Sequence, residues 1–115
     1  MITFLAAIAG FLAVAMGAFG AHALGETLTG KATGWWDTAT LYLLVHAALA
    51  AALSAHNAEK FGLATAILLA GAVLFAATLY AMALGAPRWF GAITPIGGLG
   101  MLAGWGMIAW AALKT

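Results

Sequence analysis

Four long stretches without a charged residue constrain the fold of this chain more than any other feature. They cover residues 2–24, 38–55, 61–84 and 95–113. A helix needs about 17–25 mostly apolar residues to cross the hydrocarbon layer, and each stretch has such a length. We therefore predict an all-α membrane protein: four transmembrane helices in an antiparallel bundle, with both termini on the same side. The expected helices of this single domain (1–115) are 2–24, 38–55, 61–84 and 92–113.

Composition excludes several other classes of protein. The chain is 66% hydrophobic and 6% charged, with mean hydropathy +1.10; an ordinary soluble domain has about 25% charged residues. A net charge of +1 provides no basic patch for nucleic acid. The absence of cysteine excludes disulfides, thiolate metal sites and cysteine catalysis.

The first apolar stretch admits a second interpretation. It ends in Ala21-His22-Ala23, which imitates the cleavage pattern of a signal peptide. No Lys or Arg precedes the apolar run, however, so we expect a retained transmembrane helix.

The connectors suggest how the chain sits in the membrane. We expect connectors at 25–37 and 85–94 to share one face, with Trp35-Trp36 and Trp89-Phe90 at the headgroup level. Lys31 and Arg88 lie on that face, and the other two cationic side chains lie on the face of the termini. The amino terminus adds a charge there, which favours cytoplasmic termini in a bacterial inner membrane.

Polar side chains gather in one half of the predicted bundle. Thr38, Tyr42 and His46 recur at four-residue steps and form one stripe, around which we expect the other helices to close. The candidate pocket consists of His46, Tyr42, Thr38, Tyr80, Thr78 and His22. Asp37 and Arg88 are expected at its mouth or as an ion pair between loops. The alternative is that His46 only hydrogen-bonds a neighbouring helix and orients packing.

Small residues indicate where helices approach closely. Gly10 and Gly17 recur with alanines along the first helix, and Gly97, Gly100 and Gly104 along the fourth. We expect the first face inside the bundle, whereas the second could also join two copies. Thr94 is expected to cap the fourth helix, with Pro95 in its first turn.

No cofactor or catalytic motif is expected. Haem bound between two histidines needs imidazoles at one depth, yet His22 and His46 are offset by about 9 Å and His56 lies at the far end of its helix. A zinc site lacks three or four converging ligands. We therefore predict that the protein is not an enzyme.

Three ordered motifs carry a resemblance to a known family: GAFGAHAL at 17–24, W-x-T-A-x-x-Y-x-x-x-H at 36–46, and GAITPIGG at 91–98 followed by Gly104-Trp105. The chain resembles the YgdD/YwdK-like small membrane proteins, a domain of unknown function, number four-two-three. The resemblance implies a four-helix inner-membrane protein and implies no activity.

Two functional hypotheses remain open at this stage. The first is a non-enzymatic accessory or assembly subunit that packs against itself or a larger membrane complex. The second is binding or transport of a small molecule, lipid or quinone through the half-pocket around His46. Membrane lipids are expected partners in both cases.

Overall fold

The computed structural model describes residues 1–114 of the chain. Its helices in chain order are α1 (Ile2–His22), α2 (Lys31–His56), α3 (Ala58–Ala83) and α4 (Thr94–Leu113), with the short 3-10 helix η1 (Arg88–Ala92) before α4. No strand occurs in this described part. α1, α2, α3 and α4 together with η1 are each long and apolar enough to cross a membrane. The prediction of an all-α protein with four transmembrane helices is confirmed.

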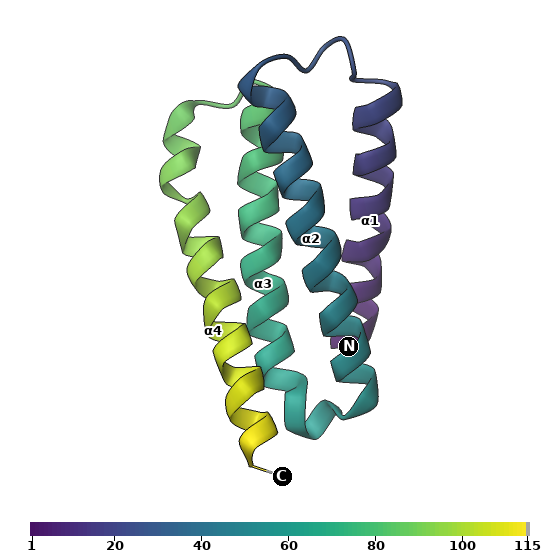
Figure 1. Ribbon diagram of the computed structural model, residues 1–115, viewed down its shortest axis with the longest axis vertical. Helices are drawn as coiled ribbons and strands as arrows, with labels where there is room; N and C mark the ends of the chain where they lie inside the picture. The colour runs from purple at the N-terminus through teal and green to yellow at the C-terminus, as the bar shows by residue number, and fades with distance from the viewer. Residues whose placement is uncertain (115) are drawn as a thin grey trace.

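Helices that follow one another in the sequence lie side by side and run antiparallel (Figure 1). α3 lies between α2 and α4, while α1 packs on α2 and touches α3 over a short stretch only. The α1–α2 and α3–α4 connectors meet at one end, and both termini lie at the other end with the α2–α3 turn (Figure 1). This agrees with the predicted topology.

α2 begins seven residues earlier than predicted, at Lys31, so that most of the expected connector 25–37 becomes its first two turns. Gly30 adopts a positive φ of 57° immediately before the helix, a conformation that favours glycine. Thr33 Oγ1 then donates to the carbonyl of Leu28 at 2.9 Å, and the buried Leu28 side chain anchors the connector. Local contacts of the connector thus accompany a helix that begins before its uncharged stretch.

The other two connections are short for identifiable reasons. Asn57 is the one residue between α2 and α3, and its side chain accepts from the Lys60 amide at 3.0 Å. The expected capping role of Thr94 is wrong. Its hydroxyl instead joins the Thr78 hydroxyl at 2.7 Å and donates to the Phe90 carbonyl at 3.3 Å, while Pro95 does occupy the first turn of α4.

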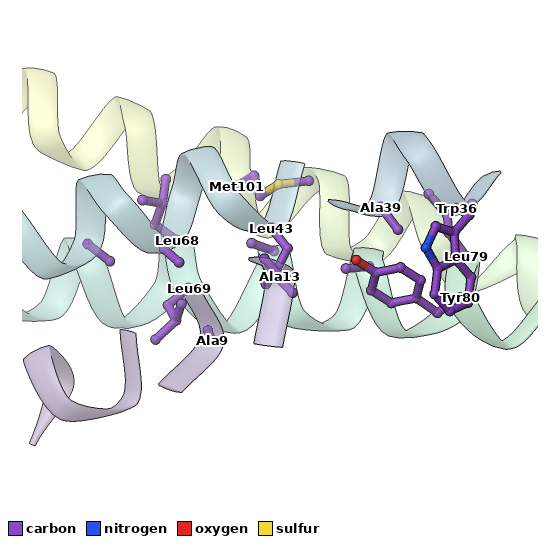
Figure 2. Packing of buried hydrophobic residues seen from close by; sticks show 14 of the residues in the cluster. Ala9, Ala13, Trp36, Ala39, Leu43, Leu68, Leu69, Leu79, Tyr80 and Met101 are labelled. Carbon is purple, nitrogen blue, oxygen red and sulfur yellow. The ribbon is translucent and has the colours of Figure 1, made fainter. Parts of the chain in front are cut away.

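The interior combines alanines with large side chains in about equal number between the helices (Figure 2). On α1 the buried residues are Ala6, Ala9, Ala13 and Gly20. Gly10 and Gly17 also face α2, since an added Cβ would lie 3.8 Å from the Ala47 Cβ and 3.0 Å from the Thr40 Cγ2. This contact suits a membrane, where close packing replaces the hydrophobic drive between helices.

The closest helix approach joins α3 and α4 through glycine. A Cβ on Gly97 would lie 2.5 Å from the Phe75 nitrogen, one on Gly104 2.6 Å from the Leu68 Cβ, and one on Gly71 2.6 Å from the Met101 nitrogen. A Cβ on Gly100 would lie 3.0 Å from the Gly71 Cα. α3 of the same chain therefore covers the glycine face that the sequence also allowed for pairing two copies.

Candidate functional site

The polar half of the molecule begins at Trp36, whose side chain the structure buries between α2, α1 and α3. The side chain is 2% exposed and its Nε1 donates to the Met16 carbonyl of α1 at 2.8 Å. Its ring meets Tyr80 edge-on, with centroids 4.6 Å apart (Figure 2). The indole fits because Gly20 has no side chain, since a Cβ there would collide with Trp36.

His46 links two helices through both ring nitrogens. Nδ1 lies 2.6 Å from the Tyr42 carbonyl, one turn earlier on α2, and Trp105 Nε1 of α4 donates to His46 Nε2 at 3.1 Å. A carbonyl can only accept and an indole N–H can only donate. The geometry therefore requires a neutral imidazole with its proton on Nδ1, and the ring is 7% exposed.

Tyr42 shows that the other helices do not close around the predicted stripe. It is 40% exposed, and its ring packs on Phe75 at 4.8 Å between centroids. Its hydroxyl has no hydrogen bond among residues 1–114. The glycine contact draws α4 onto α3 and away from α2, which leaves an open groove of about 600 Å³ between α2 and α4. We call it the α2/α4 groove; its polar lining is Tyr42, His46 and Trp105.

The remaining candidate pocket residues lie at separate places. The Tyr80 hydroxyl bonds Thr40 of α2 at 2.7 Å, and Thr78 bonds Thr94 of α4. Thr38 is half-buried, and His22 is exposed in the last turn of α1. The structure therefore brings Tyr42 and His46 to one groove and distributes the other four of the six elsewhere.

Asp37 and Arg88 form no ion pair within the described residues, and both side chains are exposed. Asp37 borders a small cavity of about 280 Å³ between α1 and the start of α2. Arg88 begins η1 at the far side of the same end of the molecule. The predicted loop ion pair is thus absent from residues 1–114.

Sequence reasoning missed Thr40 and Trp105 as partners of the predicted polar residues. Both lie within or beside the motifs already quoted, Thr40 between Trp36 and Tyr42 and Trp105 directly after Gly104. Their spacing did not identify them, because each partner lies on another helix. In the described part, every buried side-chain nitrogen and oxygen has a hydrogen-bond partner.

Side-chain hydrogen bonds join each pair of helices that pack together. Thr3–Ser54 and Trp36–Met16 join α1 to α2, Thr40–Tyr80 joins α2 to α3, and Thr78–Thr94 joins α3 to α4. Such bonds contribute about 0.6 kcal/mol each in membranes, so they orient helices more than they stabilise them. No group of three or more metal-ligating side chains occurs among the described residues.

These features define the class of protein as a four-helix integral membrane protein, with close small-residue contacts and polar links between its helices. The chain belongs to the family described as "Protein of unknown function (DUF423)", whose sequence profile matches residues 16–98.

Curated relatives cover almost the whole chain. A UPF0382 membrane protein of Haemophilus influenzae is 44% identical, over 96% of this chain and 92% of its own length. The UPF0382 inner membrane protein YgdD of Escherichia coli is 38% identical, over 95% of this chain and 86% of its own length. A UPF0382 membrane protein of Staphylococcus epidermidis is 37% identical, over 96% and 93%. No solved structure matches.

Proposed function

We propose that the protein is a non-enzymatic accessory or assembly subunit of the bacterial inner membrane, which packs against itself or larger membrane partners. The observation that carries this is a groove of about 570 Å³ between α1 and α3, the two helices that scarcely touch. We call it the α1/α3 groove. Its walls are apolar, from Ile2 to Leu12 on α1 and from Ala66 to Ala77 on α3.

The α3 wall of this groove suits another helix. Ala66, Ala70 and Ala77 lie on one side of α3, and Ala9 faces them from α1. Small side chains let a second backbone come close, which is how helices associate when lipid is as apolar as they are. The polar groups inside the chain already bond to one another, so docking there need not disturb them.

Filling the groove tests the proposal. Ala70→Phe places a ring in the α1/α3 groove, whereas Ala103→Phe places the same ring on the exposed side of α4 as a matched control. Both variants are compared with the natural chain by native mass spectrometry from nanodiscs and by cross-linking in membranes. We expect the oligomer or complex to shrink in Ala70→Phe alone. Equal sizes in all three proteins would refute assembly through this groove.

The exposed Tyr42 hydroxyl favours one second candidate, a small molecule, lipid or quinone bound in the α2/α4 groove. A hydroxyl at this depth has no water to bond, so a ligand carbonyl could be its partner. Tyr42→Phe removes only that oxygen. Loss of a co-purifying small molecule from this variant, with assembly unchanged, would favour binding over docking.

The orientation proposed for the chain places both termini in the cytoplasm. Lys60, Lys114 and the amino terminus lie at that end, against Lys31 and Arg88 at the other. The amino terminus makes the difference, in accord with the excess of positive charge on cytoplasmic faces.

A further inference from the structure

A groove of about 510 Å³ opens between the first turns of α3 and the last turns of α4, at the end that holds both termini. We call it the lysine groove, because Lys60 and Lys114 line its mouth from the two helices. It is separate from the α1/α3 groove and from the α2/α4 groove, with which it shares no lining residue.

The mouth of the lysine groove is cationic. Its charged lining residues are Lys60, Lys114 and Glu59, so the two ammonium groups exceed the single carboxylate by one charge. Lys60 Nζ lies 5.4 Å from the centre of the Phe61 ring, and Lys114 Nζ lies 5.5 Å from that of Trp110. Neither lysine forms an ion pair within residues 1–114. Both ammonium groups can therefore meet an anion.

The depth of the groove is apolar. Leu63 and Ala64 of α3 lie one turn beyond Lys60, and Ala111 and Met107 of α4 lie one and two turns inward from Lys114. The groove thus changes from cationic to apolar along the direction in which the helices enter the membrane. Trp110 lines it near the mouth, where indole rings favour the headgroup level.

We propose that the lysine groove binds an anionic phospholipid of the surrounding bilayer. The phosphate lies between Lys60 and Lys114, and an acyl chain lies along Leu63, Ala64 and Met107. Basic pockets between transmembrane helices are suited to phosphate headgroups, and the apolar wall gives a lipid a contact that a free phosphate lacks. The excess positive charge favours an anionic over a zwitterionic headgroup.

The full chain in detergent is titrated with phosphatidylglycerol and with phosphatidylcholine of the same acyl chains, and bound lipid is counted by native mass spectrometry. We expect phosphatidylglycerol to bind more tightly. The affinity of the double variant Lys60→Gln/Lys114→Gln should be roughly 25-fold lower, about fivefold for each charge. Lys31→Gln/Arg88→Gln removes the same charge from the other end and should keep the affinity.

Two further arms separate the possible sources of the phosphate. Met107→Trp fills the apolar wall and leaves both lysines, so it should weaken the lipid but not glycerol phosphate, the soluble headgroup. Circular dichroism establishes that each variant is folded. The proposal is overturned if the two lipids bind equally, if both double variants lose affinity equally, or if glycerol phosphate binds as tightly as the lipid.

Discussion

At the scale of single residues, His46 is an ionisable side chain that the fold keeps as a neutral link between helices. Its position within a membrane span makes a charge costly. The Tyr42 carbonyl and the Trp105 indole together occupy both ring nitrogens. The imidazole therefore links α2 to Trp105 of α4 at the α2/α4 groove.

The tautomer of His46 follows from these two contacts. We expect ¹⁵N NMR of the chain in bilayers to find the proton on Nδ1, because its neighbour there can only accept. Trp105→Phe keeps an aromatic ring but removes the donor to Nε2, and should shift the Nε2 resonance most. A ring protonated on Nε2 in the natural protein would contradict the geometry.

At the scale of helices, the close contact between α3 and α4 depends on glycines, which have no Cβ. Gly71 lies opposite the segment from Gly97 to Met101, and Gly104 lies against Leu68. At such separations backbone meets backbone, and no rotamer change can make room for a methyl group.

A pair of matched substitutions on α4 tests this contact. Gly104→Ala should lower the free energy of unfolding by about 1–3 kcal/mol, because the new methyl overlaps Leu68. Gly98→Ala adds the same methyl to the same helix, where nothing lies within 4 Å, and should cost nothing. Unfolding with SDS in mixed micelles, followed by circular dichroism, measures both. Equal losses would show that the overlap with Leu68 does not decide the outcome, since alanine itself favours a helix over glycine at both positions.

The same comparison applies at α1, where Gly20 makes room for the Trp36 indole. Gly20→Ala should displace the indole and break its bond to the Met16 carbonyl, at a cost of about 1–3 kcal/mol. Gly34→Ala, on α2 and free of neighbours within 4 Å, is the control. Quenching of tryptophan fluorescence by a lipid-soluble quencher should increase only in Gly20→Ala.

At the scale of the whole molecule, the helices form a row from α1 to α4 that is only partly folded back on itself. The molecule extends over 49 × 27 × 19 Å. Such an arrangement leaves grooves on both sides of α3, one toward α1 and one toward the end of α4. In a bilayer such grooves are filled by lipid or by other helices.

The topology of the molecule can be read by labelling, since the natural chain has no cysteine. Thr29→Cys and Arg88→Cys place thiols in the two connectors at one end, and Asn57→Cys places one in the turn at the other. A membrane-impermeant maleimide added to intact cells reaches thiols on one side of the membrane only. It should therefore either label Thr29→Cys and Arg88→Cys but not Asn57→Cys, or label Asn57→Cys alone. Labelling of Thr29→Cys and Arg88→Cys from different sides would contradict the fold.

The spans and part of the packing could be predicted from the amino-acid sequence alone. The number of helices and their direction depend on local composition, because an uncharged stretch of that length is stable only across the hydrocarbon layer. The spacing of alanines and glycines along α1 likewise predicted the face that packs closely inside the bundle. The cap that Asn57 provides at the start of α3 is equally local, since its side chain accepts from the amide of Lys60, three residues away.

Tertiary structure alone decided which polar groups meet. Each of three side chains forms a hydrogen bond with a partner on a different helix: Tyr80 with Thr40, Thr78 with Thr94, and His46 with Trp105. The predicted pocket assumed that depth in the membrane determines proximity, but the rotation of each helix also matters, and neighbouring helices determine it. Trp36 is buried for the same reason, because Gly20 and Met16 of α1 accommodate it. Spans follow from the transfer of each segment into lipid, whereas contacts depend on all four helices packing together.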